Sequence, residues 1–294
     1  MFNQLGVIGC GLMGGSFALA LKRAGLVKRV VGYSKSPSTT VRARKLGVID
    51  VEAESALLAV AGSDIVLIAV PVAASEATFK AIRHLVEPGV LFMDVGSTKR
   101  DVVDAARRVL RERIPSFVPA HPIAGKEAGG IQNADAALYQ GRQVILTPIS
   151  STAPELVQRA TDVWAAIGAQ VLKMSPENHD AAFAAVSHLP HLLAFAYFSA
   201  MEKQPAGRDF LSLAGPGFRD FTRIAASDPA MWRDVLIANR EEVLKQSQRF
   251  RHALDALEHV MNSGNAEALE GLIRGAAEGR ANWQMSVPRG QSGS

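Results

Sequence analysis

Polar side chains that could take part in chemistry gather in three stretches of the sequence. The first is Ala120-His121-Pro122-Ile123-Ala124-Gly125-Lys126-Glu127, which directly follows a predicted strand. The second is Ser187-His188-Leu189-Pro190-His191, and the third spans residues 217–232, with Arg219, Arg223 and Trp232. Imidazole exchanges protons near neutral pH, and polar groups within apolar segments need a partner or a purpose. Each stretch is therefore a candidate functional site.

Each of the three stretches also has a purely structural interpretation. A histidine before proline at the end of a strand, such as His121, is often a turn residue, and His188 and His191 can be hydrogen-bonded groups of a helix interior. The two arginines can form ion pairs with neighbouring aspartates on a surface. The histidines lack companion ligands at metal-site spacing, and the nucleophile motif GxSxG is absent. We therefore predict neither a metal centre nor a serine hydrolase.

The elements that must position these residues begin with a glycine-rich turn near the N-terminus. An apolar run at residues 5–8 predicts a buried strand, and Gly9-Cys10-Gly11-Leu12-Met13-Gly14 follows it at once. An Ala-rich segment with helical spacing begins at Ser16. Strand, GxGxxG and helix in this order indicate a dinucleotide-binding turn, although such a turn can also serve structure alone.

Each glycine of this turn has a physical task. Gly9 allows a tight turn, Gly11 lets a pyrophosphate approach the backbone, and Gly14 lets helix and strand pack closely. The N-terminus of the helix adds free N–H groups and a partial positive charge. The predicted cofactor-binding residues of this turn are Gly9, Gly11, Leu12, Met13 and Gly14.

The end of the second predicted strand, residues 29–33, bears on the choice of cofactor. An acidic residue at that place normally binds the ribose of NAD, but this sequence has Ser34-Lys35-Ser36. No carboxylate is expected there to repel a 2′-phosphate, and Lys35 with two hydroxyl groups can bind one. We therefore predict NADP over NAD, the alternative being that Lys35 simply points to solvent.

Strands and helices alternate through the first half of the chain. Residues 64–71 and 89–95 form strongly apolar strands, and a helix at 101–113, a strand at 116–120 and a strand near 144–146 continue the pattern. Repeated βα units predict an α/β fold, a Rossmann-type doubly wound parallel sheet with helices on both faces. Val70 and Pro71 lie at the carboxyl end of their strand, where ligands bind in such folds. Val70 and Pro71 are therefore further cofactor-binding candidates.

The second half of the chain is expected to be all-α, because strand signals stop near Leu172. A helix from Pro176 to Met201 is apolar on most faces, so it should be buried on nearly all sides and kinked at Pro190. A long helix from 228 towards 261 and a last one after Gly264 should follow. Such apolar helices predict a homodimer. The expected domains are 1–173 (dinucleotide binding), 174–285 (helical, substrate and dimerisation) and 286–294 (a disordered tail).

Composition narrows the class of protein. The chain has 294 residues, of which 48% are hydrophobic, and a net charge of +4, which suits one large or two ordinary globular domains. Its apolar runs are too short to span a membrane, its N-terminus does not resemble a secretory signal, and no basic-aromatic pattern suggests nucleic-acid binding. The single cysteine, Cys10, excludes an internal disulfide and favours a reducing cytoplasm.

Five motifs together resemble the prephenate/arogenate (cyclohexadienyl) dehydrogenase family of tyrosine biosynthesis, over residues 4–284. The motifs are Gly9-Cys10-Gly11-Leu12-Met13-Gly14-Gly15-Ser16, Asp94-Val95-Gly96-Ser97-Thr98-Lys99, His121-Pro122-Ile123-Ala124-Gly125, Ser187-His188-Leu189-Pro190-His191, and Gly217-Phe218-Arg219-Asp220 with Thr222-Arg223-Ile224-Ala225. The resemblance implies oxidative decarboxylation of prephenate to 4-hydroxyphenylpyruvate. A hydride leaves C4 for a nicotinamide, carbon dioxide leaves C1, and formation of the aromatic ring drives the reaction.

The resemblance also implies roles for particular residues. His121 matches the family's catalytic histidine, which accepts the proton of the C4 hydroxyl group, and Ser97 matches a serine that orients that hydroxyl and the nicotinamide. Arg223 matches the arginine that binds a substrate carboxylate through two hydrogen bonds.

The remaining matches concern substrate choice and support. His191 matches a position where members that use prephenate carry histidine, which favours prephenate with arogenate as a second substrate. Arg219 is a weaker substrate-binding candidate, His188 is expected to hold the site together, and Trp232 is expected to line the pocket from a neighbouring subunit. The alternatives are a dehydrogenase acting on a β-hydroxy acid or an imine, and a non-catalytic NADP-binding regulator.

Overall fold

A computed structural model describes residues 1–126 and 128–284, and the predicted tail at 286–294 lies outside them. The internal contacts divide the chain into two compact units, Met1–Arg240 and Glu241–Ser294, which are described separately.

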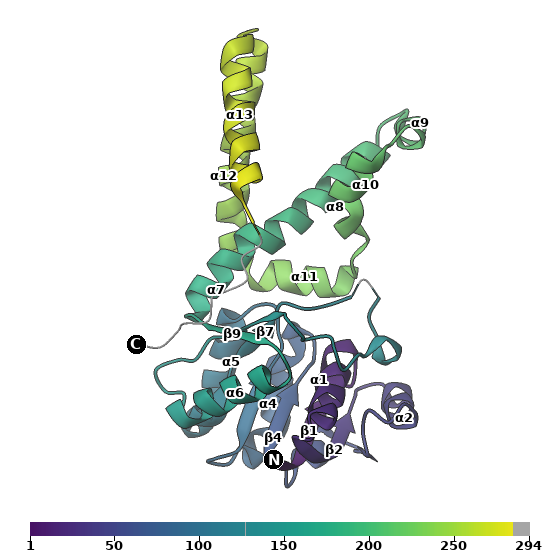
Figure 1. The fold of residues 1–294 in the computed structure, drawn as a ribbon, viewed down its shortest axis with the longest axis vertical. Coiled ribbons are helices and arrows are strands. Elements are labelled where there is room, and N and C mark those ends of the chain that lie inside the picture. Colours follow the sequence, from purple (N-terminus) through teal and green to yellow (C-terminus); the bar gives the residue numbers. More distant parts are fainter. Residues whose placement is uncertain (127, 285–294) are drawn as a thin grey trace. The chain divides into compact units, whose positions relative to one another are not determined.

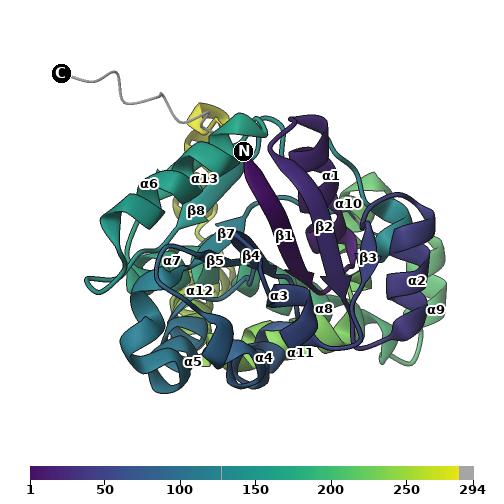
Figure 2. The same cartoon turned by 90° about the horizontal axis from the view of Figure 1, so that it is seen from below.

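A six-stranded parallel sheet forms the centre of the first unit (Figures 1 and 2). Its strand order is β3-β2-β1-β4-β5-β6, with every neighbouring pair parallel. This order confirms the predicted doubly wound fold, whose ligand crevice lies where the order reverses, between β1 and β4. The strands are β1 (Phe2–Ile8), β2 (Val27–Tyr33), β3 (Val51–Glu52), β4 (Ile65–Ile68), β5 (Leu91–Asp94) and β6 (Phe117–Val118).

Helices cover both faces of the sheet, which is why its central strands are apolar throughout. One core lies under α1 (Leu12–Arg23), α2 (Pro37–Lys45) and α6 (Pro154–Ala166). The other lies under α3 (Ala56–Val60), α4 (Ser75–Ile82) and α5 (Arg100–Leu110), on the opposite side of the strands in Figure 2. In β4 all four residues are buried, as a strand covered on both faces requires.

A second, three-stranded sheet corrects one expectation. The strand predicted near 144–146 does not join the parallel sheet; as β8 (Gln143–Leu146) it pairs antiparallel with β7 (Ala120–Pro122) and parallel with β9 (Gln170–Lys173). The predicted strand at 116–120 is likewise divided into β6 and β7. Pro119 separates the two pieces, and proline has no N–H group to donate to a continuous ladder. The break starts β7, and with it His121, in a new direction.

The helical part of the first unit begins with a continuous run, Pro176–Glu202. It consists of α7 (Pro176–Phe183), the π-helical turn η5 (Ala184–His188) and α8 (Leu189–Glu202). The irregular turn directly precedes Pro190, which cannot donate a backbone hydrogen bond, so the predicted interruption is found there. The helices α9 (Gly207–Ser212), α10 (Pro216–Thr222), the short η6 (Arg223–Ala226) and α11 (Pro229–Ala238) follow. In Figure 1, α11 lies over the carboxyl ends of the parallel strands.

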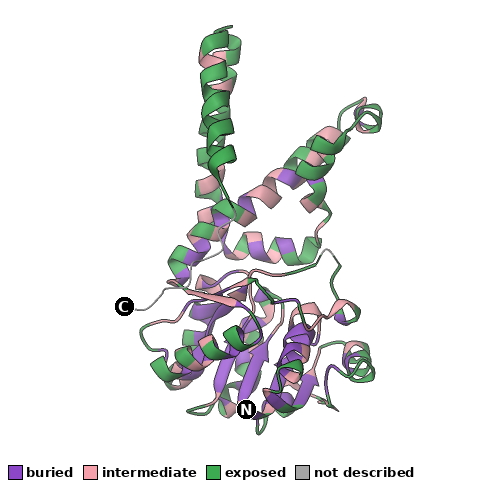
Figure 3. Cartoon of the chain, in the orientation of Figure 1, coloured by how far each residue is buried: buried purple, intermediate pink, exposed green. Residues whose placement is uncertain are grey.

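The prediction that the 176–201 helix is buried on nearly all sides is wrong for the single chain. In α8 only Leu189 and Ala194 are buried, and the rest is partly or fully exposed (Figure 3). By length and composition alone the run Pro176–Glu202 would suffice to cross a membrane. However, it contains His188, which is buried and hydrogen-bonded inside the protein. An apolar surface of this kind calls for a covering partner.

The second unit contains α12 (Arg240–Asn262) from Glu241 onward and the whole of α13 (Ala266–Asn282). The single long helix predicted from 228 to 261 is instead two helices, α11 and α12, because Asn239 has left helical geometry at the end of α11 and its side chain binds groups in the helical run before it. The predicted last helix after Gly264 is present as α13.

Candidate active site

The glycine turn has the geometry that a dinucleotide requires. Gly9 has a φ of +98°, and a Cβ atom there would lie 2.2 Å from the carbonyl oxygen of Ala69. A Cβ atom at Gly14 would lie 2.1 Å from the carbonyl oxygen of Gly9, so the geometry agrees with the tight turn expected at Gly9 and the close packing expected at Gly14. At Gly11 a Cβ would meet nothing within 4 Å, and no side chain caps the N-terminus of α1. Open space beside uncapped N–H groups fits a pyrophosphate.

A cavity of about 550 Å³ lies at the carboxyl ends of β1, β4 and β5, directly above this turn. It brings together residues that the sequence places far apart, and its floor and walls also receive side chains from α11. The predicted site residues in its lining are Gly11, Leu12, Met13, Val70, Pro71, Ser97 and His121. Residues of the lining that were not singled out as binding or catalytic include Lys126, Asp228, Met231, Asp234 and Val235.

Ser34 and Lys35 line a separate depression of about 430 Å³ at the end of β2, and Ser36 follows them in the chain. The hydroxyl oxygen of Ser34 accepts a hydrogen bond from the backbone N–H of Cys10 at 2.8 Å, so this serine supports the glycine turn. The side chains of Lys35 and Ser36 are exposed. The expectation that no carboxylate lies nearby is wrong, because Glu52 and Glu54 line the same depression.

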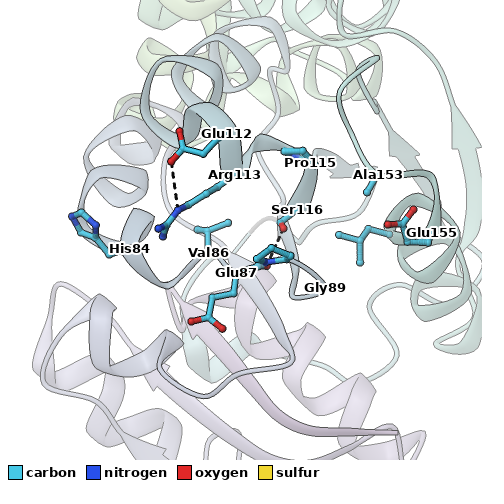
Figure 4. Close-up of a pocket in the computed structure, with 12 residues that line it drawn as sticks. His84, Val86, Glu87, Gly89, Glu112, Arg113, Pro115, Ser116, Ala153 and Glu155 are labelled. Atoms are coloured by element: carbon cyan, nitrogen blue, oxygen red, sulfur yellow. Dashed lines mark hydrogen bonds and ion pairs between the residues drawn. The ribbon is translucent and has the colours of Figure 1, made fainter.

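Another cavity, of about 490 Å³, lies at the opposite edge of the sheet (Figure 4). Its lining comes from the segments that precede β5 and β6, such as Glu87 and Ser116, and from the start of α6. Arg113 at its rim faces Glu112, with 3.8 Å between the guanidinium and carboxylate atoms. None of the predicted site residues lines this cavity, and ligands of doubly wound folds bind at the other edge. The cavity above the glycine turn is therefore the candidate active site.

A line of hydrogen bonds runs from His121 into the protein. Nδ1 of His121 lies 2.8 Å from Nε2 of His179, and Nδ1 of His179 lies 2.7 Å from Oδ1 of Asp180. His179 and Asp180 are buried in α7, whereas His121 is half-buried on β7 and lines the cavity. Because Nδ1 of His121 faces His179, Nε2 is the nitrogen left for a ligand.

The surroundings keep His121 uncharged at neutral pH. Burial is the main reason that its pKa lies well below the usual 6.5, and the charges of His179, Lys99 and His188 lower it further. A neutral imidazole with one unprotonated nitrogen is the form that can accept a proton.

A buried ion pair supports the strand that carries His121. The ammonium group of Lys99 donates to Oδ2 of Asp94 and, at 2.7 Å, to the carbonyl oxygen of Ala120, the residue before His121. Asp94 also accepts from the backbone N–H of Ala120 at 3.0 Å. Lys99 and Asp94 are 0% and 2% exposed, so the pair holds the end of β5 and the start of β7 together away from water.

Asp180 also connects two helices. Its carboxylate accepts the backbone N–H groups of Lys99 at 2.8 Å and Arg100 at 2.9 Å, at the start of α5. The side-chain amide of Asn239 donates to the backbone carbonyl of Asp180 at 2.8 Å and lies 3.1 Å from Nδ1 of His188. His188 is therefore part of the framework, as expected, and its burial lowers its pKa to about 4.

The predicted substrate-binding residues lie on the helices. Nδ1 of His191 lies 2.9 Å from the carbonyl oxygen of Ser187, and its ring stacks on Trp232 with 3.5 Å between ring centres. Donation from Nδ1 to a carbonyl leaves Nε2 of His191 as an acceptor. Burial lowers the pKa of His191, and the charge of Arg223 contributes to the shift. Arg219 is exposed and lies 3.1 Å from Asp220.

Two family descriptions match this chain. "Prephenate dehydrogenase, nucleotide-binding domain" matches residues 17–173, and "Prephenate dehydrogenase, dimerization domain" matches residues 175–275. The chain belongs to the prephenate dehydrogenase family. The two matches meet near residue 174, whereas the contacts separate units after Arg240, so the domain boundaries proposed from the sequence stay a prediction.

Individual relatives agree with this family assignment. The chain is 36% identical to "Prephenate dehydrogenase" of Bacillus subtilis, over 92% of this chain and 73% of the relative. It is 33% identical to "Cyclohexadienyl dehydrogenase" of Zymomonas mobilis, over 92% of each. Among solved structures, prephenate dehydrogenase from A. aeolicus in complex with hydroxyphenyl propionate and NAD+ superimposes with a TM-score of 0.87 at 35% identity, covering 96% of this chain and 98% of that one.

Reasoning from the sequence missed the residues behind His121. His179 and Asp180 were not singled out, and Lys99 was noted only as part of a motif. A usable signal exists in retrospect: His179-Asp180 is an ionisable pair in a helix that continues with apolar residues, Ala181-Ala182-Phe183. The partner of that pair lies 58 residues earlier in the chain, a relationship that no local pattern shows.

Proposed function

We propose that this protein is a prephenate dehydrogenase, which converts prephenate to 4-hydroxyphenylpyruvate and carbon dioxide. The observation that carries the proposal is that the neutral His121 and residues of the glycine turn line the same cavity. When bound, a nicotinamide dinucleotide supplies the hydride acceptor for C4 of the substrate. The first turn of α1 would hold its pyrophosphate.

The residues of the chain divide the remaining tasks. Nε2 of His121 takes the proton of the C4 hydroxyl, and Ser97, in the same lining, orients that hydroxyl. Arg223 binds a substrate carboxylate through its two parallel N–H groups, beside His191. Loss of the ring carboxylate as carbon dioxide completes the aromatic ring, so the protein needs only to position the substrate, move one proton and exclude water.

Arogenate is the second candidate substrate. It differs from prephenate in its side chain, which carries an amino group in place of the keto group. An unprotonated Nε2 on His191 accepts a hydrogen bond, and this supports some use of the amino compound beside prephenate. The similarity to a relative named cyclohexadienyl dehydrogenase supports the same dual use.

For the cofactor we propose NADP, with NAD as the alternative. The exposed ammonium group of Lys35 and the hydroxyls of Ser34 and Ser36 support binding of a 2′-phosphate. Glu52 and Glu54 line the same depression and oppose it, so the preference is expected to be modest. Lys35→Ala should lower kcat/KM for NADP and leave that for NAD unchanged. A strong preference for NAD in the unmodified protein would contradict the proposal.

We further propose a homodimer formed through the helices. Large apolar side chains are exposed on α8 to α11 and on the helices of the second unit, for example Ile237 at 61% and Leu244 at 63%. The match to a description named dimerization domain over residues 175–275 supports this assembly. Sedimentation showing a monomer at micromolar concentration would contradict it.

The decisive experiment for the activity measures reduced cofactor by absorbance. Purified protein is offered prephenate or arogenate with NADP or NAD, in all four combinations, and the product is identified separately, as 4-hydroxyphenylpyruvate from prephenate or tyrosine from arogenate. Turnover is expected with prephenate, and more slowly with arogenate. Absence of turnover in all four combinations would overturn the assignment.

A further inference from the structure

The hydrogen bonds determine which nitrogen carries each proton along the line His121–His179–Asp180. Asp180 accepts two backbone N–H groups, and together with His179 these hold the pKa of Asp180 below its usual value although burial opposes ionisation. A carboxylate only accepts hydrogen bonds, so Nδ1 of His179 carries the proton that lies between them. Nε2 of His179 is then unprotonated and accepts from Nδ1–H of His121. The remaining nitrogen of His121, Nε2, is unprotonated.

We propose that His179 accepts a proton from His121 when His121 takes the substrate proton. This proton relay rests on the proposed function. As Nε2 of His121 takes the proton of the C4 hydroxyl, the proton on Nδ1 of His121 passes to Nε2 of His179. One N–H bond forms and one breaks on His121, which ends neutral, and one N–H bond forms on His179. The positive charge then lies on His179, in contact with the Asp180 carboxylate at 2.7 Å.

The charges around the two rings favour this transfer. A proton held on His121 would be a buried positive charge with the Lys99 ammonium nearby. On His179 burial and Lys99 also oppose the charge and its pKa stays below the usual 6.5, but a direct hydrogen bond to Asp180 and the charges of Asp180 and Asp94 offset part of this. In a medium of low polarity, direct contact with an opposite charge outweighs more distant repulsion. His179 therefore positions His121 and accepts a proton from it, whereas His121 is the residue that contacts the substrate.

A purely structural role for His179 is the competing explanation. Its ring stacks on Phe183 with 4.5 Å between ring centres, and Phe183 also lies 4.9 Å from the ring of His121. In that case His179 would only pack the catalytic ring in place. The two explanations differ in what they predict for protons, which two measurements can follow.

The first measurement is NMR of protein labelled with ¹⁵N-histidine, without substrate at neutral pH. The relay requires both His121 and His179 to carry their proton on Nδ1, and His121→Asn and His179→Gln assign the two signals among seven histidines. Observation of His179 protonated on Nε2 would overturn the proposal. This measurement does not depend on activity, so it tests the positions of the protons on the two histidines separately from the proposed reaction.

The second measurement is the single-turnover rate in mixtures of H₂O and D₂O. The relay predicts a curved dependence on the deuterium fraction, because two protons move together. His179→Gln keeps an acceptor for His121 Nδ1–H but cannot hold a second proton, so the dependence becomes linear and the rate falls by roughly 100-fold. The KM for prephenate and the cofactor affinity should stay within about 2-fold, since neither ligand touches this position.

Phe183→Leu is the matched control. It removes the ring that packs on both histidines and leaves every N–H bond of the line intact, so the curved dependence should remain. A linear dependence in the unmodified enzyme would overturn the relay and leave the proposed function standing. The expected tautomers without turnover of prephenate would instead count against the proposed function. If His179→Gln does not fold, the dependence of the unmodified enzyme's rate on the deuterium fraction still decides.

Discussion

The two sides of the candidate site are built in different ways. On the sheet side, Lys99 and Asp94 are buried and bound to defined partners, and His179 of α7 is buried behind His121 of that side. On the helical side, Arg219 and Arg223 are exposed, and His191 is half-buried against Trp232. Proton transfer needs fixed distances in a medium of low polarity, whereas recognition of an anion tolerates contact with water. The difference indicates that the sheet side handles the proton and the helical side selects the substrate.

The largest expected effect is on the sheet side, from His121→Asn. Asparagine can still donate to Nε2 of His179, so the framework should remain while the proton acceptor is lost. We expect kcat to fall by roughly 10³-fold, within the range for removal of a general base. Cofactor affinity, measured by fluorescence titration, should change less than about 2-fold. A kcat within 10-fold of the unmodified enzyme would remove His121 from the chemistry.

The next largest effect is on stability, from Lys99→Met. It leaves the buried Asp94 carboxylate without its ammonium partner. Removing one partner of such a pair costs about 3–5 kcal/mol of unfolding free energy, which urea denaturation can measure. The control is Lys80→Met, which removes an exposed pair with Glu76 at 2.8 Å and should lower the unfolding free energy far less, because water screens that pair. Equal losses for both variants would show that burial of the pair is unimportant.

On the helical side, Arg223→Ala should mainly raise the KM for prephenate. Loss of two charge-assisted hydrogen bonds to a carboxylate is expected to cost about 3 kcal/mol, roughly 100-fold in KM, with kcat changed far less. Arg219→Ala is the matched control, because Arg219 is an exposed arginine like Arg223 but lies 3.1 Å from Asp220. An equal rise in KM for both variants would mean that general positive charge, and not one placed guanidinium, attracts the substrate.

The smallest expected effect is on the pH dependence of stability, and it comes from His188, where the two sides of the site adjoin. Its folded-state pKa of about 4 lies below the 6.5 of an unfolded histidine, so between these values the unfolded chain binds a proton that the folded chain does not. Stability from this group is therefore complete above pH 6.5 and decreases as the pH falls. Between pH 7 and pH 5 the loss should be about 2 kcal/mol.

The measurement for His188 compares urea denaturation at pH 7 and pH 5. In His188→Gln, which can still bind Asn239, the extra loss at pH 5 should be about 2 kcal/mol smaller than in the unmodified protein. The same loss in both proteins would show that His188 is not kept neutral by the fold.

Much of the sheet side could be predicted, because its signals are local. The order of strand, Gly9 turn and helix and the apolar strand β4 both depend on residues close in sequence. The two-residue strand β3 was missed because it is too short to show a period. The sheet of β7, β8 and β9 was misassigned because pairing direction is a property of distant segments.

The helical side was predicted less well for a related reason. Apolar residues throughout α8 indicate burial, yet the pattern does not say whether the covering surface belongs to the same chain. The break at Asn239 was missed because its cause is a contact with Asp180, 59 residues earlier, and not a helix-breaking residue.

The sequence by itself determined the class of fold and the dinucleotide turn, since both follow from residue types at short spacing, and the role of His121 as candidate base is what its resemblance to a known family implies. Only the tertiary structure determined which residues lie behind His121. Lys99 and Asp180 approach within hydrogen-bond distance across 81 residues, and His179 meets His121 across 58. Such contacts depend on how α7 packs against the end of β5 and the start of α5. The state of a buried proton is therefore decided by packing, which no local pattern of residues specifies.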